Sequence, residues 1–163
     1  DTLGVRQSLH TLRGPRGLLL MFICNHCPYV QAIIGRICRD ALELQGMGFG
    51  VAAIMSNDTE AYPDDSLANM QKVARAMNFS FPYLYDVTQN VARDYEAVCT
   101  PDFFGFNQDL ELQYRGRLDA SGRTTATPDA RRELVDAMRQ IAASGHGPAD
   151  QLASIGCSIK WRT

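Results

Sequence analysis

A continuous apolar run, Leu18–Ile23, leads directly into a pair of cysteines, Cys24 and Cys27. Six consecutive apolar residues leave no polar side for solvent, which is typical of a strand buried on both faces of a sheet. From Pro28 to Gln45 apolar side chains recur at helical spacing, and proline suits the first helical position because its missing N–H needs no partner there. The sequence therefore predicts a buried strand and a helix, joined by a short loop that holds two thiols.

The rest of the chain continues this alternation of strand and helix. Alternating strands and helices imply a parallel core, to which a hairpin adds antiparallel strands at one side. We therefore expect an α/β fold in one domain, residues 1–163, with a central mixed β-sheet covered by helices on both faces. The other predicted β elements are an edge hairpin or single strand and a turn within 4–17, strands over 50–55 and 83–85, and a hairpin of 103–106 with 110–115. A helix is predicted over 66–78, capped by Asp64, Asp65 or Ser66, and another over 88–98, with Val91 and Tyr95 inward. The last predicted helix is capped by Thr127 and begins at Pro128, with Ala130, Leu134, Met138 and Ile141 inward.

Composition excludes several classes of function. The 163 residues include 16 basic and 18 acidic side chains, for a net charge of −2, so no basic excess is present to bind nucleic acid. The longest apolar run, Leu18–Cys24, is far shorter than the roughly 20 residues that span a bilayer, and no signal-peptide pattern is present. We expect no membrane partner and a cytoplasmic location. Because the chain starts at Asp1 without a methionine, we also expect an upstream piece to be missing.

The segment Cys24-Asn25-His26-Cys27 offers the parts of a redox site. A thiolate is the reactive form of cysteine, but an ordinary thiol with a pKa near ~8.5 is mostly protonated at neutral pH. The N–H groups and dipole at a helix N-terminus favour the thiolate, and a protonated His26 favours it further. Two sulfurs three residues apart can also close a disulfide ring. The loop is thus a candidate site with an activated nucleophile and a resolving partner.

Other interpretations of the cysteines stay open. A structural zinc site needs further ligands, and no second CxxC or HxxxH is present. A metal-binding module could instead use Cys24, Cys27 and His26, since thiolates beside an imidazole suit Cu(I) or Zn. The two cysteines could also be buried and inert, with His26 only a hydrogen-bonding loop residue. The chain holds five cysteines, and Cys38 lies on the inner face of a predicted helix, where it is expected to pack in the core.

The order of these motifs resembles the thioredoxin fold: a strand, a cysteine pair, a helix, then Thr100-Pro101 before a hairpin. The segments SLHTLRG, MFICNHCPYV, FPYLYDVTQNVARDYEAVCTPDFF, YRGRLD and GCSIKW are similar to the redoxin branch of thioredoxin-like proteins. That branch is related to the alkyl-hydroperoxide-reductase/thiol-specific-antioxidant (AhpC/TSA) group. The resemblance implies a thioredoxin-like fold, a cis Pro101 that faces the site, and backbone groups of Thr100 offered to an incoming disulfide. Cys99 would then be a spare or buried thiol beside this loop.

The resemblance implies a thiol–disulfide oxidoreductase with no cofactor and no metal. Its partners would be a disulfide-bearing protein or small thiol/disulfide substrate and a thiol electron donor, and the oligomeric state stays open. Pro28 suits the first helical position only if Cys27 lies near the cap, so we prefer Cys27 as the nucleophile and Cys24 as its resolver. His26, Thr100 and Pro101 complete the candidate catalytic set.

A thiol peroxidase of the peroxiredoxin-like type is the alternative function. There Cys27 becomes a sulfenic acid, and Cys24 or Cys157 resolves it. The peroxidase branch carries a Pro and a Thr seven and three residues before its reactive cysteine, and this chain has neither before Cys24 or Cys27. Arg115 and Arg117 are the candidates for polarising peroxide.

The segment GCSIKW, residues 156–161, contains a third cysteine of interest. A mobile segment would let Cys157 reach a sulfenic acid elsewhere in the fold. We instead expect this segment to be docked by Ile159 and Trp161, with Cys157 buried beside them, because burying the tryptophan stabilises docking by roughly a few kcal/mol.

Overall fold

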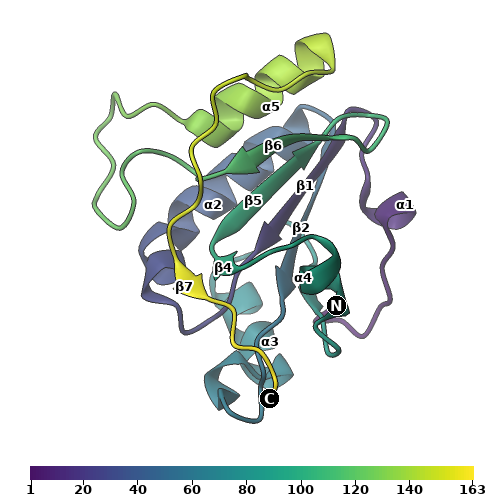
Figure 1. Cartoon of the computed structure of the whole chain (residues 1–163), viewed down its shortest axis with the longest axis vertical. Helices are drawn as coiled ribbons and strands as arrows, with labels where there is room; N and C mark the ends of the chain where they lie inside the picture. Colours follow the sequence, from purple (N-terminus) through teal and green to yellow (C-terminus); the bar gives the residue numbers. More distant parts are fainter.

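A five-stranded mixed sheet forms the centre of the structure, a computed structural model that describes all 163 residues. Its strand order is β3-β2-β1-β5-β6, and a separate two-stranded sheet pairs β4 with β7 (Figure 1). The strands are β1 (Gly17–Phe22), β2 (Phe49–Met55), β3 (Tyr83–Tyr85), β4 (Cys99–Thr100), β5 (Asp102–Phe106), β6 (Leu112–Gly116) and β7 (Cys157–Ser158). The helices are α1 (Leu9–Leu12), α2 (Pro28–Gly46), α3 (Leu67–Ala76), α4 (Asn90–Asp94) and α5 (Glu133–Ser144), with a 3₁₀ turn, η1, at Pro63–Asp65.

The central strand β1 is buried at all six positions, as its apolar run predicts. It runs parallel to β2, where Leu19 faces Val51, and antiparallel to β5, where Leu19 faces Gly105. β2 is also parallel to β3, and β5 is antiparallel to β6. The sheet is therefore mixed in direction, and the predicted parallel core with an antiparallel hairpin at one side is confirmed.

Side chains of β1 alternate between two hydrophobic cores. Leu19 and Met21 point into the larger core, which is closed by α2, α3 and α5. Leu20 and Phe22 point into the smaller core, which contains Ala92 of α4 and Ile159 beyond β7. Helices thus cover both faces of the sheet, as predicted (Figure 1). None of these helices combines the length and the apolar character needed to cross a membrane.

Gly105 in β5 allows α5 to pack close to the sheet. A Cβ atom at this position would lie 2.5 Å from Sδ of Met138 and 3.2 Å from Cβ of Tyr114. The first contact is too close, so the end of the Met138 side chain would have to shift. The absence of a side chain at Gly105 therefore lets α5 pack at this distance from the sheet with Met138 in place.

The N-terminal segment differs from its prediction. Residues 4–16 hold no strand; they contain the short helix α1, and an isolated bridge pairs Gly14 with Gly17, the first residue of β1. Ser8 caps α1 by accepting the N–H of Thr11, and Thr11 Oγ1 accepts the N–H of Ser8 in return. The alternation of apolar residues suggested extended backbone here, but this reciprocal cap stabilises one helical turn instead.

Helices α4 and α5 are shorter than predicted. α4 is limited by left-handed backbone at Gln89 and Glu96, which lie just outside its two ends. Within it Ala92 is buried, whereas Val91, expected inward, is 37% exposed. α5 begins at Glu133 rather than Pro128, so Thr127 is not its cap. Its buried residues include Leu134, Met138 and Ile141, as predicted, while Ala130 lies before the helix and is only half-buried.

Candidate active site

The two cysteines lie in the loop that connects β1 to α2. β1 ends at Phe22, and Cys27 is the N-cap of α2, directly before Pro28. Both are free thiols and both are buried, with Cys24 exposing 2% of its surface and Cys27 none. The predicted position of the pair, at a strand-to-helix junction with Cys27 at the cap, is confirmed.

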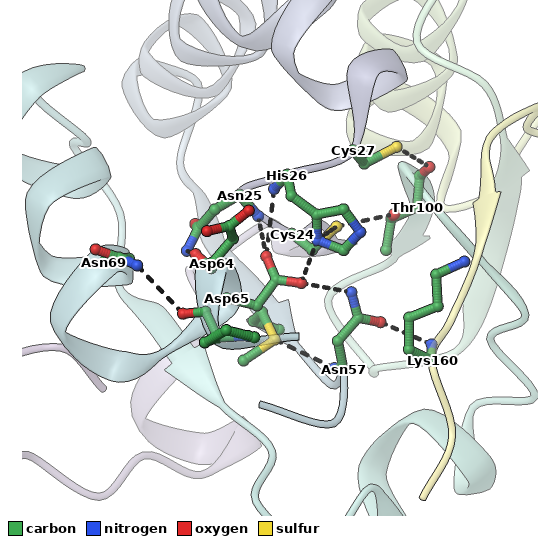
Figure 2. Close-up of polar contacts among 12 residues, drawn as sticks. Cys24, Asn25, His26, Cys27, Asn57, Asp64, Asp65, Asn69, Thr100 and Lys160 are labelled. Atoms are coloured by element: carbon green, nitrogen blue, oxygen red, sulfur yellow. Dashed lines mark hydrogen bonds and ion pairs between the residues drawn. The ribbon is translucent and has the colours of Figure 1, made fainter. Parts of the chain in front are cut away.

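Thr100 contacts both sulfurs. The Cys27 thiol donates a hydrogen bond to the Thr100 carbonyl at 3.1 Å, and Cys24 Sγ lies 3.4 Å from Thr100 Oγ1 (Figure 2). The peptide bond between Thr100 and Pro101 is cis. The position that the family resemblance implied for this dipeptide, beside the cysteine pair, is thus found in the structure.

The surroundings shift the two thiol pKa values in opposite directions. The pKa of Cys27 is lowered, first by a hydrogen bond from the Cys24 thiol and also by hydrogen bonds from Cys157, although burial acts against this. The pKa of Cys24 is raised, first because it donates to Cys27, then by burial and by the negative charge of Asp65. These opposite shifts favour loss of the proton from Cys27 before Cys24. This direction agrees with the preference for Cys27 drawn from the sequence; the catalytic roles stay predictions.

His26 is held by a buried carboxylate that the sequence did not assign to the site. Asp65 accepts His26 Nδ1 at 2.6 Å through Oδ2, and its Oδ1 accepts the N–H groups of Asn25 at 2.7 Å and His26 at 3.3 Å (Figure 2). Asn57 donates a fourth hydrogen bond, to Oδ2, at 2.8 Å. Asp65 was expected at most to cap a helix, but Ser66 is the residue at the N-cap of α3. Its role arises through contacts far apart in sequence, so no local pattern signals it.

The His26 ring faces Cys24 rather than Cys27. Because Nδ1 donates to the Asp65 carboxylate, it carries the proton. The same Nδ1 is 4.0 Å from Cys24 Sγ, and the ring stacks on Tyr62 with centroids 5.6 Å apart.

The fold does not bring together the three residues that the sequence suggested as metal ligands. Cys24 and His26 have donor atoms that lie within 4.8 Å of one another and of an Asp65 oxygen, and Cys27 is not part of this group. Both oxygens of Asp65 already accept hydrogen bonds. The donor set of Cys24, Cys27 and His26 that the sequence suggested is thus not brought together as such, and Asp65 serves to position the loop.

The segment 156–161 is docked, as predicted. β7 pairs with β4, and Ile159 is buried and donates its N–H to Val98 at 3.0 Å. Trp161 is half-buried beneath the guanidinium of Arg93, 4.5 Å from the ring centroid. Cys157, however, is only half-buried, and it packs against the core cluster that contains Cys27.

The remaining cysteines stand apart from this chemistry. Cys38 is half-buried rather than in the core, and its thiol lies 3.8 Å from the carbonyl of Met77. Cys99 in β4 is half-buried beside the carbonyl of Pro101, and burial, followed by the charge of Asp102, raises its pKa to about 11. Both are therefore thiols at neutral pH.

The two arginines considered for peroxide chemistry have other partners. Arg115 donates to the carbonyl of Glu96 at 2.6 Å and lies 3.5 Å from an oxygen of Asp102. Arg117 forms two hydrogen bonds with Glu133, both 2.8 Å long. Neither guanidinium donates a hydrogen bond to Cys24 or Cys27.

An open pocket of about 640 Å³ adjoins the thiol pair. Its wall includes Pro28 and Pro101, the residues that directly follow Cys27 and Thr100. Tyr29 and Ile155 add apolar surface, and Arg123 stacks over the Tyr29 ring at 4.7 Å. The pocket gives a ligand a place to lie against Pro28 and Pro101, although neither cysteine lines it.

Comparison with known proteins fits this arrangement. The model of the AhpC/TSA family matches residues 1–116. The chain belongs to the AhpC/TSA family. No curated protein matches this family member. Membership supports a redox function, that of an oxidoreductase.

Solved structures similar to this AhpC/TSA protein fall into two groups. An uncharacterized conserved protein from Geobacillus kaustophilus is 43% identical, with a TM-score of 0.88 over 94% of this chain and 82% of the other. A hypothetical protein from Sinorhizobium meliloti 1021 is 34% identical, with a TM-score of 0.90 over 99% and 88%. A secreted disulfide oxidoreductase from Mycobacterium tuberculosis is 16% identical, with a TM-score of 0.60 over 87% and 91%. This last, distant similarity shows the thioredoxin-like fold, as expected.

Proposed function

We propose that this AhpC/TSA-family protein is a thiol–disulfide oxidoreductase in which Cys27 is the nucleophile and Cys24 resolves the mixed disulfide. The observation that carries the proposal is that both sulfurs lie against Thr100, with Cys27 as the N-cap of α2: Cys24 Sγ is 3.4 Å from Thr100 Oγ1, and Cys27 Sγ is 3.1 Å from the Thr100 carbonyl oxygen. The interaction between the two thiols lowers the pKa of Cys27 and raises that of Cys24. A nucleophile and a second thiol in contact are the two parts that thiol–disulfide exchange needs.

The reaction balances within the pair and its substrate. The Cys27 thiolate attacks one sulfur of a substrate disulfide, the substrate S–S bond breaks, and the first substrate thiolate leaves and takes up a proton. Cys24 then loses its proton and attacks Cys27 Sγ, which releases the second substrate sulfur as a thiol. The substrate gains two electrons and two protons, and the Cys24–Cys27 disulfide is the oxidised product. An external thiol donor returns the pair to the reduced state.

The pocket beside the pair supports a disulfide-bearing protein or a small disulfide as the substrate. Its apolar wall includes Pro28 and Pro101, which directly follow Cys27 and Thr100 in the sequence. The carbonyl oxygen of Thr100, which accepts the Cys27 thiol in the reduced protein, lies 3.1 Å from the reacting sulfur. Thr100 therefore positions Cys27 and lies beside the path of an incoming disulfide.

Turnover of insulin disulfides with a dithiol donor tests this function. We expect Cys27→Ser to abolish turnover and Cys24→Ser to trap a mixed disulfide with the substrate. Cys38→Ser is the matched control, because it removes a half-buried thiol outside the site, and it should leave turnover unchanged. Full insulin reduction by Cys27→Ser would refute the assignment. Hydrogen peroxide turnover that exceeds disulfide turnover in the parent protein would replace the proposed activity with that of a peroxidase.

A further inference from the structure

A third cysteine lies against the thiol pair. In the antiparallel pairing of β4 with β7, Cys157 faces Thr100, whose carbonyl accepts the Cys27 thiol. Figure 1 shows β7, in yellow, lying next to β4. Cys157 packs against the hydrophobic core cluster that contains Cys24 and Cys27, and it is among the groups that lower the pKa of Cys27. Cys27 therefore has two thiol neighbours, Cys24 and Cys157.

Gly156 brings β7 this close to Thr100. A Cβ atom at Gly156 would lie 2.0 Å from the Thr100 carbonyl oxygen and 2.5 Å from its carbon, inside any tolerated contact with rigid backbone. Any residue other than glycine would therefore push β7 away from β4. The contact between Cys157 and Cys27 depends on this small residue.

The hydrogen-bond network that holds the cysteine loop also anchors the segment carrying Cys157. The N–H of Lys160 donates to Asn57 Oδ1 at 2.9 Å, and the amide of Asn57 donates to Asp65 at 2.8 Å (Figure 2). Asp65 in turn holds His26 and Asn25. Cys157 thus has a defined place relative to the pair and needs no large movement to meet it.

The three sulfurs differ in their access to solvent. Cys24 exposes 2% of its surface and Cys27 none, whereas Cys157 is only half-buried. A reductant that approaches the surface meets Cys157 before either sulfur of the pair. Because Cys157 contacts Cys27, a disulfide can pass from the buried pair to this outer position by a single exchange.

We propose that Cys157 is a third redox thiol, which takes the disulfide over from Cys24 and presents it to an external dithiol reductant. The inference rests on the proposed function, which generates the Cys24–Cys27 disulfide. The Cys157 thiolate attacks Cys27 Sγ, the Cys24–Cys27 bond breaks, and Cys24 leaves and takes up the proton that Cys157 lost. This exchange moves the disulfide to Cys27–Cys157 with no net oxidation.

The external dithiol then reduces the outer disulfide. One of its sulfurs attacks Cys157 and expels Cys27 as a thiolate. Cys27 is the better leaving group because a thiolate of low pKa leaves faster, and its surroundings already stabilise the anion. The second sulfur of the dithiol releases Cys157 as a thiol. The reductant supplies two electrons and two protons and ends as a disulfide.

Peptide mapping after oxidation with oxidised dithiothreitol and acid trapping tests the linkage. Trypsin leaves Cys24 and Cys27 within one peptide, residues 17–36, and Cys157 in another, residues 140–160. A bond from Cys157 to either cysteine of the pair therefore cross-links these two peptides, and in Cys24→Ser only Cys27 is left in the first peptide to form it. We expect that pair in the parent protein, and as the main product in Cys24→Ser. Its absence from both proteins would overturn the proposal.

Kinetics then test whether the outer disulfide is used. We expect Cys157→Ser to slow reduction of the oxidised protein by dithiothreitol by roughly tenfold, since an exposed sulfur is lost as the point of attack. Gly156→Ala should cause the same slowing although Cys157 is still present, and Cys38→Ser should cause none.

The two proposals fail in different ways. If the parent protein reduces insulin and Cys157→Ser is reduced by dithiothreitol as fast as the parent, the role of Cys157 is wrong and the proposed function stands. If the parent protein does not reduce insulin, the proposed function is wrong, and the relay from Cys24 to Cys157 falls with it. Thermal unfolding of Cys157→Ser at the parental temperature excludes a folding defect as the cause of a slow reaction.

Discussion

Asp65 Oδ1 accepts the backbone N–H of Asn25 at 2.7 Å across 40 positions of sequence. The other oxygen of this carboxylate, Oδ2, accepts hydrogen bonds from the side chains of His26 and Asn57. A single fully buried acid in the turn before α3 therefore shapes the loop between the two cysteines. Its replacement should affect both the stability of the fold and the chemistry of Cys24.

Asp65→Asn is expected to destabilise the reduced protein by about 2 to 4 kcal/mol, because an amide nitrogen cannot accept hydrogen bonds and leaves buried donors unpaired. It should also lower the pKa of Cys24, since the Asp65 charge is among the causes that raise it. Urea unfolding measures the first effect and site-resolved alkylation the second. Asp64→Asn is the matched control at an exposed neighbour and should change neither quantity. Equal stability of the Asp65 variant and the parent would contradict this role.

Cys27 should titrate at lower pH than Cys24. Alkylation by iodoacetamide, followed at each cysteine by mass spectrometry, should give Cys27 a midpoint below the ordinary thiol value of about 8.5 and Cys24 one above it. The reason is the proton that Cys24 keeps while it donates to Cys27. The reverse order of midpoints would exchange the roles of nucleophile and resolver.

Removal of the Thr100 hydroxyl should slow resolution. Its hydrogen bond to Cys24 lowers the pKa of that thiol, against the larger effects that raise it. Thr100→Val loses this bond, so we expect the mixed disulfide on Cys27 to persist roughly three to ten times longer, as the loss of about 1 kcal/mol implies. Thr100→Ser keeps a hydroxyl and should behave like the parent. Rapid-quench trapping of the mixed disulfide measures its lifetime, and equal lifetimes in Val and Ser variants would rule the effect out.

Two glycines should respond in opposite ways to alanine. Gly35 lies inside α2 with open space where its Cβ would be, so Gly35→Ala should stabilise the fold by about 0.5 to 1 kcal/mol through helix propensity. Gly105→Ala places a Cβ against Met138 and should destabilise it by about 1 to 3 kcal/mol. Urea unfolding of both variants tests the pair. Stabilisation by alanine at Gly105 would show that α5 is not held at the distance described.

The Glu43 carboxylate should make stability depend on pH in acid. Its pKa is lowered, first by a hydrogen bond from Arg132 and also by Arg139. A lowered folded-state pKa adds stability above the unfolded value of about 4.3, and this stability is lost as the pH falls through the folded-state pKa. Because the Glu43 side chain is 30% exposed, Glu43→Gln should cost less than about 1 kcal/mol at pH 7. The difference from the parent should vanish in strong acid; a difference that grows there would contradict the sign.

Local patterns predicted the part of the fold that carries the cysteines. β1 and α2 lie within one residue of their expected ends, because an unbroken apolar run and a helical repeat each report directly on burial. Pro28 marked the start of the helix correctly. The place of Thr100-Pro101 followed from the family resemblance, since nothing in the dipeptide itself points to the cysteines.

The features that the sequence missed depend on contacts between distant segments. Asp65 reads as a helix cap because its partners, Asn25 and His26, come from another part of the chain. The contact of Cys157 with Cys27 likewise exists only once β7 pairs with β4. The helix predicted over 88–98 is longer than α4 because the spacing of apolar residues does not reveal the left-handed backbone at Glu96.

The burial of the two sulfurs has a kinetic consequence. A reagent or substrate can touch Cys27, which exposes none of its surface, only while the chain around it is locally open. Labelling should therefore rise with reagent concentration and then reach a plateau, at which the opening rate alone sets the speed. Below the plateau, the slope reports the fraction of time spent open. A ligand that occupies the pocket beside Pro28 and Pro101 and holds its walls together would slow the opening, and the plateau would fall with it.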